Sequence, residues 1–309
     1  MPLHNGLKDF NGSRDCFLSI GNFDGVHLGH QSILSRLVEL AQSNNRQSVV
    51  LTFEPHPIQL LRPEFAPPRL TSLQEKTKRI LATGVDHVVV YPTDEALLNL
   101  TAEEFFQQIV VDHFHAQGLV EGPNFFFGKN RAGNIQSLAK LCDAHEMSLN
   151  ILSPLENNGE MTSSSAIRKA IENGDMRTAK TQLGRAYSIS GKVIQGDQRG
   201  RTIGFPTANL SDVETLIPAD GVYAARVEFA DKTYSTAVNI GPNPTFGIKS
   251  KKIEAHLLNF NGDLYGRTLQ LEFIQQIRSI QIFNSAEDLK QQINQDLLQV
   301  REILSDVDE

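Results

Sequence analysis

The 309-residue chain has no tryptophan, only two cysteines and no long apolar run. The few cysteines and the lack of a long apolar run each argue against particular classes of protein. Cys16 and Cys142 form no CxxC pair, which argues against a disulfide framework and against a closed cysteine zinc site. No segment approaches the ~20 apolar residues that a membrane helix needs. The first residues lack the apolar core of a signal peptide, so we expect a cytoplasmic protein with reduced thiols.

The chain also lacks an excess of positive charge. It carries 29 Lys and Arg against 36 Asp and Glu, for a formal net charge of −7 and a pI near 5.7. A nucleic-acid-binding surface would need clustered basic residues, so we expect neither a nucleic-acid nor a membrane partner. An anionic ligand must therefore be held by local groups. The length predicts about two domains, and a hydrophobic content of 40% is enough for real cores.

The first half of the chain alternates strand-like with helical patterns. The strand-like runs lie at 16–20, 48–53, 87–91, 118–120 and 148–152, and the helical patterns between them lie at 74–83, 102–114 and 136–145. This βα alternation predicts an α/β fold with a doubly wound parallel sheet and helices on both faces. Ligands of such sheets bind outside the carboxyl ends of the strands, near the switch in strand order.

The segment GNFDGVHLGH at 21–30 lies where an apolar strand turns into a helix. Such a turn directs unpaired backbone N–H groups and the positive end of the helix dipole at a ligand, which favours phosphate oxygens. Gly21 and Gly29 allow a sharp turn and a close approach of the backbone. His27 and His30 could donate hydrogen bonds to charge that develops on a phosphate during transfer. A partial metal site and two polar residues at a helix start are the alternatives.

Two further segments follow predicted strands, where a nucleotide site should collect its residues. FEPHP at 53–57 is held extended by its prolines, although it could equally be a surface loop. GPNFFFGKNRAGN at 122–134 combines aromatic faces with basic side chains and could hold a ring and a phosphate, although consecutive phenylalanines could instead belong to the core.

The segment TSSSAIR at 162–168 opens a predicted helix, because its hydroxyls can cap free N–H groups. One hydroxyl is enough for a cap. The remaining hydroxyls and Arg168 could bind a phosphate, and a capped, solvated helix start is the alternative.

These segments together resemble bacterial FAD synthetases of the HxGH nucleotidyltransferase superfamily. The signature GxFDGxHxGH is matched at 21–30, and the TFxPHP, GxxFxFGxxRxG and ISSTxIR segments of that family follow in the same order. The resemblance implies that His27 and His30 assist adenylyl transfer to FMN. It also implies a nucleotide site made of Gly21, Asn22, Phe23, Gly29, Asn124, Arg131, Ser164, Ser165 and Arg168, and flavin contacts from Phe53, Pro55, His56, Pro57 and Phe125.

The composition changes after Gly184, where we place the boundary between a domain of residues 1–184 and a domain of residues 185–309. Short strand-like runs follow at 187–194, 222–229, 234–240, 253–258 and 269–273. Strands at this spacing predict a small antiparallel β-barrel. The apolar spacing of 286–304 predicts a terminal amphipathic helix that packs on the barrel.

A glycine-rich basic loop at 191–201 precedes GFPTANL at 204–210, although a plain β-turn would explain this loop about as well. In an extended segment, Thr207 and Asn209 point the same way and supply two neutral oxygens. Neutral oxygens together with waters and phosphates suit Mg²⁺.

The second half resembles riboflavin kinases through GFPTANL, GVYA at 221–224, NIGPNPTFG at 239–247, EAHLLNF at 254–260 and DLYG at 263–266. The whole chain thus resembles bacterial bifunctional riboflavin kinase/FMN adenylyltransferases, which implies synthesis of FMN and then FAD with ATP and Mg²⁺. The resemblance implies that Glu254 is the general base for riboflavin, that Thr207 and Asn209 hold the metal, and that Arg278 contacts flavin or nucleotide. The implied nucleotide contacts in this half are Gly191, Lys192, Gly196, Arg199, Gly204, Thr207 and Asn209. Taken alone, a strand glutamate such as Glu254 could simply be solvated.

The chain departs from these families at a few positions. Asn124 and Asn134 stand where many members have Asp, and Ile280 and Ile282 replace the Glu and Lys of IRxExKF. Loss of the carboxylates is expected to alter metal or substrate affinity, and the isoleucines suggest a modified flap or a packing surface. A single-activity enzyme and a non-catalytic flavin-binding regulator stay open as alternatives. We expect riboflavin, FMN and ATP as small-molecule partners, and a monomer or weak homo-oligomer.

Overall fold

The computed structural model describes residues 2–10, 12, 15–157, 160–196, 200, 204–242 and 251–305. The chain divides into two compact units, the first made of Met1–Pro67 and Thr71–Ser163 and the second of Pro68–Leu70 and Ser164–Glu309. Side chains of 164–184 belong to the core of the second unit, because Ile167 and Leu183 pack into the same buried cluster as the barrel strands. The domain boundary that we predicted after Gly184 concerns the two functional halves of the chain, and it stays a prediction.

The first unit contains a parallel sheet whose six strands follow the order β1-β4-β3-β2-β5-β8. Their bounds are β1 Leu3–Asn5, β2 Phe17–Ile20, β3 Ser48–Glu54, β4 His87–Pro92, β5 Gly118–Glu121 and β8 Ser148–Ile151. The chain leaves β2 toward β3 on one side and later crosses to β5 on the other. The switch in strand order therefore lies beside β2, which is where a ligand crevice is expected.

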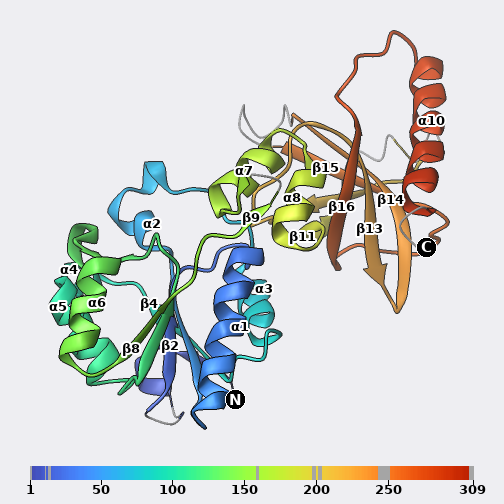
Figure 1. The fold of residues 1–309 in the computed structure, drawn as a ribbon. Helices are drawn as coiled ribbons and strands as arrows, with labels where there is room; N and C mark the ends of the chain where they lie inside the picture. Colours follow the sequence, from blue (N-terminus) through green and yellow to red (C-terminus); the bar gives the residue numbers. More distant parts are fainter. Residues whose placement is uncertain are drawn as a thin grey trace. The chain divides into compact units, whose positions relative to one another are not determined.

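Helices cover both faces of this sheet, as Figure 1 shows. Helices α1 (Leu28–Ser43) and α3 (Leu73–Leu81) pack against one face. The other face carries α4 (Glu95–Asn99), α5 (Ala102–Phe105) and α6 (Ile135–Ala144). Neighbouring residues of β3 point to opposite faces, with Val49 in one cluster and Val50 in the other. The predicted doubly wound fold is confirmed.

Shorter elements complete the first unit. They are η1 Leu7–Asp9, α2 Pro57–Leu61, η2 Pro63–Phe65, the π-helix η3 Phe106–Val111, β6 Phe126–Phe127, η4 Lys129–Arg131, β7 Gly133–Asn134, β9 Glu156–Asn157 and β10 Glu160–Met161. The helix expected at 102–114 is thus one turn of α-helix that continues as a π-helix. The spacing of apolar residues alone does not distinguish an α-helix from a π-helix, because both place apolar side chains on one face.

The second unit contains a closed antiparallel barrel in the order β11-β12-β15-β14-β13-β16. The strands are β11 Tyr187–Ile194, β12 Ala208–Ser211, β13 Gly221–Phe229, β14 Lys232–Pro242, β15 Lys251–Leu257 and β16 Thr268–Arg278. Helices α7 (Ser164–Glu172), α8 (Met176–Leu183) and α10 (Ala286–Ser305) belong to the same unit. The predicted barrel and terminal helix are confirmed, and α10 buries Val300 and Leu304 against barrel residues Ala224 and Leu258.

β12 was not predicted as a strand of its own, although it completes the barrel by pairing with both β11 and β15. Its four residues are too few to show an alternation of apolar and polar side chains. Along β15 that alternation is clear, because Ile253, Ala255 and Leu257 are buried in the barrel while the residues between them face outward.

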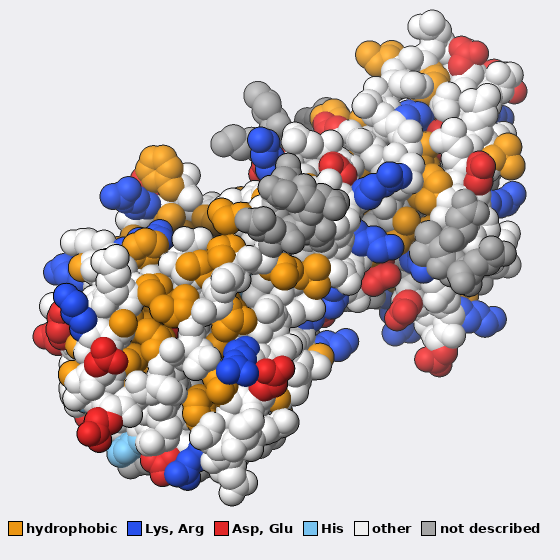
Figure 2. Space-filling model, in the orientation of Figure 1, with side chains coloured by type: hydrophobic (Ala, Val, Ile, Leu, Met, Phe, Trp, Pro, Cys, Tyr) orange, Lys and Arg blue, Asp and Glu red, His pale blue; other side chains and the backbone are white. Residues whose placement is uncertain are grey.

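The surface of the first unit carries exposed apolar side chains. Figure 2 shows them gathered on the drawn face of that unit, and the most exposed large ones include Leu60, Leu61 and Phe65, in and just after α2. None of the helices in the described ranges combines the length and the hydropathy that crossing a membrane would require.

Candidate active sites

Three of the segments predicted to bind a nucleotide lie at one edge of the first-unit sheet. The segments 21–27, 55–57 and 122–131 follow β2, β3 and β5, which are neighbouring parallel strands. The carboxyl ends of parallel strands meet at one edge, so these segments come together at the edge where β2 ends. The fourth segment starts α7 in the second unit, where Arg168 Nε donates to Pro68 O at 2.7 Å. A nucleotide-binding role for Ser164, Ser165 and Arg168 stays a prediction.

The loop between β2 and α1 has a strained backbone. Phe23, Gly25 and Val26 have φ values of 49°, 84° and 40°, and such values are unfavourable for a buried β-branched residue such as Val26. Thr71 holds the loop in place, because its N–H and hydroxyl donate to Asp24 Oδ1 at 3.2 and 3.3 Å and its oxygen accepts from Gly25 N at 3.2 Å. Strain of this kind concentrates at binding sites, where the surrounding structure has to support it.

The two signature histidines form a stacked pair at the start of α1. His27 is the N-cap, and its Nδ1 accepts a hydrogen bond from the backbone N–H of His30 at 3.3 Å. The rings lie 3.6 Å apart at 17°. A Cβ at Gly29 would come within 3.2 Å of the His27 ring, which explains why glycine stands between the histidines. Because Nδ1 accepts, a neutral His27 carries its proton on Nε2.

His30 is held in its neutral form. Burial lowers the pKa of its imidazole well below the ordinary value, and the neighbouring His27 and the positive charge of Lys76 lower it further. Its Nδ1 is buried and has no hydrogen-bond partner within the described ranges. An uncharged imidazole of this kind can donate a hydrogen bond to a ligand placed above the helix start.

Lys76 is a site residue that the sequence analysis missed. Its side chain is 6% exposed, and Nζ donates to Thr52 Oγ1 at 3.2 Å. The hydroxyl of Thr52 in turn donates to the backbone oxygen of Asn22 at 3.3 Å. Lys76 lies on α3, where one lysine among several looks like a solvated residue, so only the tertiary structure reveals its position below the loop.

Asn22 connects the signature loop with the FEPHP segment. One end of its amide lies 2.9 Å from His56 Nε2, while the other end is buried and has no hydrogen-bond partner among the described residues. The Nδ1 of His56 accepts from Ile58 N at 3.1 Å, and Pro57 starts α2. A buried amide end without a partner is the kind of group that a bound ligand satisfies.

The phenylalanines after β5 divide between core and surface. Phe127 is buried, and Phe125 stacks on it at 5.4 Å and 15°. Phe126 is exposed, and the guanidinium of Arg131 lies 4.5 Å from its ring centroid. Phe126 therefore offers an open aromatic face beside a cation, which the predicted flavin contact, Phe125, does not. Asn124 is exposed on the same segment.

Two polar residues at this edge have structural partners. Asn134 caps α6 in a capping box with Ser137, so this departure from the family pattern keeps a helix cap in place. Glu121, at the end of β5, is buried and accepts from Ile20 N at 2.8 Å. Burial raises the pKa of Glu121 well above its ordinary value.

In the second unit, five residues of five strands lie in one row across the outside of the barrel. The strand register pairs Asn209 with Glu254, Glu254 with Asn239, Asn239 with Val222 and Val222 with Arg278. Directly paired residues of neighbouring strands point to the same face and lie about 5 Å apart. Three of the predicted kinase residues thus stand in this row.

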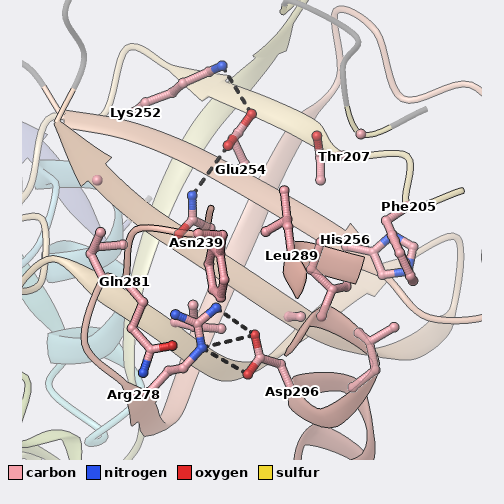
Figure 3. A pocket seen from close by; sticks show the side chains of 18 of the residues that line it. Phe205, Thr207, Asn239, Lys252, Glu254, His256, Arg278, Gln281, Leu289 and Asp296 are labelled. Carbon is pink, nitrogen blue, oxygen red and sulfur yellow. Dashed lines mark hydrogen bonds and ion pairs between the residues drawn. The ribbon is translucent and has the colours of Figure 1, made fainter. Parts of the chain in front are cut away.

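A cavity of about 440 Å³ lies beside the row, between the barrel, the segment after β16 and α10 (Figure 3). One part of its wall is polar and includes Thr207, Asn239, Lys252, Glu254 and His256. The other part is apolar and includes Val222, Ala237, Ile280, Phe283, Leu289, Ile293 and Leu297. The cavity is suited to a ligand with a flat apolar ring at one end and hydroxyl groups at the other.

Glu254 is held by two donors at the polar part of the cavity. Lys252 Nζ lies 3.1 Å from Oε1, and Asn239 Nδ2 donates to Oε2 at 3.3 Å, as the dashed lines of Figure 3 show. Lys252 and Asn239 fix the direction of the carboxylate. Neither was predicted as a site residue, although Lys252 stands two residues before Glu254 and so faces the same side of the strand.

Asn209 has a buried amide oxygen with no hydrogen-bond partner among the described residues. A Cβ at Gly196 would come within 2.7 Å of three atoms of this amide, so the loop approaches Asn209 closely because residue 196 is glycine. The described ranges contain no group of three or more His, Cys, Asp or Glu side chains arranged to hold a metal. Beside Asn209, a cation would find neutral oxygens in the Asn209 amide and the Thr207 hydroxyl.

Three of the other predicted nucleotide contacts lie in β11 or in the loop before β12. Gly191 and Lys192 lie in β11, where Lys192 pairs with Ser211 of β12, and Gly204 has a φ of 94° in the loop before β12. Arg199 lies outside the described residues. Arg278 lines the cavity, but its guanidinium is paired with Asp296 of α10.

Two family models match the chain. The model described as FAD synthetase matches residues 10–166, and the model described as riboflavin kinase matches residues 183–304. The FAD synthetase range covers the parallel sheet, and the riboflavin kinase range covers the barrel.

Relatives match over nearly the whole length. The bifunctional riboflavin kinase/FMN adenylyltransferase of Buchnera aphidicola is 36% identical over 97% of this chain and 96% of its own, and that of Escherichia coli K12 is 38% identical over 93% and 92%. A crystal structure described as a macrolide-efflux protein from Streptococcus pneumoniae covers 97% of this chain and 99% of its own, with 29% identity and a TM-score of 0.87. That structure shares the fold of this chain.

Proposed function

Because this chain belongs to the family of bifunctional riboflavin kinase/FMN adenylyltransferases, we propose that it makes FMN and then FAD, each from a site of its own. Residues 185–309 phosphorylate riboflavin with ATP, and residues 1–184 transfer AMP from a second ATP to FMN with release of pyrophosphate. The observation that carries the proposal is the barrel cavity, whose polar part presents Glu254 and whose apolar part suits the flavin ring.

In the kinase reaction, the ribityl chain of riboflavin lies toward Glu254 and the isoalloxazine ring lies against the apolar wall. The carboxylate of Glu254 takes the proton from the 5′-hydroxyl as its oxygen attacks the γ-phosphorus of ATP, and ADP leaves. Asn239 and Lys252 hold the carboxylate in position. Positioning supplies much of the rate, because an attacking oxygen already in line avoids the entropic cost of finding that geometry.

Mg²⁺ fits the residues beside this cavity. The buried oxygen of Asn209 without a partner and the hydroxyl of Thr207 are hard, neutral ligands, which Mg²⁺ combines with waters and phosphate oxygens. When bound, the ion neutralises the charge of the ATP phosphates. Asn209 and Thr207 would hold it, while Glu254 next to Asn209 in the row stays available as the base.

In the adenylyl transfer, a phosphate oxygen of FMN attacks the α-phosphorus of ATP. The backbone N–H groups at the start of α1, the Nε2 proton of His27 and the ring of His30 donate to the charge that develops on the phosphate oxygens. Neither histidine forms a bond to phosphorus. Asn22 seats the nucleotide through the end of its amide that has no protein partner.

We also propose that the partners are the small molecules riboflavin, FMN and ATP, without nucleic acid, and that the protein is a cytoplasmic monomer or weak homo-oligomer. Sedimentation velocity over a range of concentrations tests the oligomeric state. A stable higher oligomer would contradict this part of the proposal.

The first experiment incubates the purified protein with riboflavin, ATP and Mg²⁺ and separates the flavins by chromatography over time. FMN that appears and is then converted to FAD is the expected result. FMN that accumulates without FAD would show a single-activity kinase and contradict the role of the first unit. If riboflavin is unchanged, the same assay started from FMN tests adenylyl transfer alone. Flavin binding without ATP consumption in either assay would show a regulator instead of an enzyme.

A further inference from the structure

We propose that Arg278 and Asp296 form a positioning pair that closes the apolar part of the riboflavin cavity and acts on the flavin only through this closure. The proposal rests on the proposed kinase function. It gives Arg278 a role different from the direct flavin contact implied by family resemblance, and it adds Asp296, on which the sequence analysis was silent.

The pair is buried and makes several hydrogen bonds. Arg278 Nε donates to Oδ1 and Oδ2 of Asp296 at 2.9 and 3.2 Å, and Nη2 donates to Oδ2 at 2.8 Å. The two side chains are only 15% and 5% exposed. Gln292 donates to Oδ1 of the same carboxylate at 2.9 Å. A guanidinium bound in this way has little capacity left for a ligand.

The pair joins the two elements that carry the apolar wall, and Figure 3 shows it at the edge of the cavity. Arg278 ends β16, and its Nη1 donates to Ser279 O at 3.1 Å, at the start of the segment that carries Ile280 and Phe283. Asp296 lies on α10 beside the cavity residue Leu297. One ion pair therefore fixes both the segment after β16 and the helix opposite it.

The two ends of α10 are held in different ways. Near its C-terminus, Val300 and Leu304 are buried against the barrel. Toward its N-terminus, the side chains between 286 and 295 are exposed or half-buried, and Asp296 is the first fully buried residue of the helix. Loss of the pair should therefore loosen the end of α10 that lines the cavity while the other end stays packed.

A double-mutant cycle tests the proposal. Arg278→Met, Asp296→Leu and the double variant are compared for the KM and kcat of FMN formation from riboflavin. Each single change leaves a buried charge without its partner, whereas the double change replaces the pair by apolar side chains. We expect each single variant to raise the riboflavin KM by about tenfold or more with kcat within about twofold, and the double variant to recover most of this loss.

Controls separate closure from unfolding. Arg226→Met removes an arginine that donates to Leu304 O at 3.4 Å, at the far end of α10, and should leave the riboflavin KM unchanged. FAD formation from supplied FMN should be unchanged in all variants. If a single variant fails to fold, Arg278→Lys, which keeps the charge but loses the bidentate geometry, should give a smaller rise in KM.

Two outcomes would overturn the proposal. A double variant as impaired as Arg278→Met, together with a near-normal Asp296→Leu, would show that Arg278 contacts the flavin directly. An unchanged KM in all three variants would show that the pair has no role in binding. If the wild-type protein forms no FMN at all, the kinase function itself has failed, which is a different result.

Discussion

The two candidate sites differ in the charge of their functional side chains. In the first unit, His27 and His30 are stacked at the start of a helix, and burial keeps His30 neutral. In the barrel, Glu254 is held against Lys252, and Arg278 against Asp296. The difference matches the roles that we propose: stabilising charge on a phosphate needs donors near a helix start, whereas taking a proton from a hydroxyl needs a carboxylate. Each of the following predictions tests this difference between the two sites.

The largest expected effect is the loss of the charged base. Glu254→Gln keeps the size of the side chain but removes the carboxylate, so FMN formation should fall by about 10²- to 10⁴-fold. FAD formation from supplied FMN should be unaffected. Rates of both reactions on the same preparation check this. If Glu254→Gln retained most of its kinase activity, another residue would have to be the base.

The reciprocal change removes a neutral donor. His30→Gln should lower FAD formation by about 10²- to 10³-fold, because one group that stabilises the developing phosphate charge is lost. FMN formation from riboflavin should continue at its normal rate and show that the second unit is intact. Loss of both activities in a folded variant would contradict the assignment of one reaction to residues 1–184 and the other to residues 185–309.

A smaller effect should follow from removing the cation below the histidines. Lys76→Met takes away a positive charge that lowers the pKa of His30, so that pKa should rise. If neutral His30 is the active form, the acid limb of the pH profile for FAD formation should move to higher pH. Lys78→Met, on the exposed side of the same helix, is the matched control and should leave the profile in place. Identical pH profiles of FAD formation for both variants would show that Lys76 does not act on His30.

The smallest effects should separate the two isoleucines that replace charged residues. Ile280 lines the barrel cavity, whereas Ile282 is 95% exposed. Ile280→Ser should raise the riboflavin KM by about threefold to tenfold, since it removes apolar contact with the ring. Ile282→Ser should stay within about twofold of the wild type. Equal effects on KM would mean that the segment rearranges when riboflavin binds.

The sequence predicted the architecture well where the signal was local. Alternation of strands and helices led to the doubly wound sheet, and with it to the meeting of three segments at the edge beside β2. The spacing of short strands likewise led to the barrel. Lys76 and Asp296 were missed because each is one polar residue on an amphipathic helix, and burial of such a residue depends on what the tertiary structure brings over it.

Roles implied by single positions were harder to anticipate. Asn134 looked like a lost carboxylate and turns out to cap a helix. Arg278 was predicted to contact flavin or nucleotide, and its guanidinium is paired with a carboxylate of α10, 18 residues further along the chain. Neither partner is visible from the spacing of a motif, because hydrogen-bond partners are chosen by the folded structure and not by sequence distance.

The row across the barrel sets a limit on how this enzyme can change during evolution. Asn209, Glu254 and Asn239 stand side by side only because three strands keep one register. Side chains alternate between the two faces of a strand, so a one-residue deletion before Glu254 that kept the pairing would turn its carboxylate into the barrel interior. Substitutions can adjust such a row gradually, but insertions and deletions within these strands would abolish it in one step. Variation in length should therefore be confined to the loops.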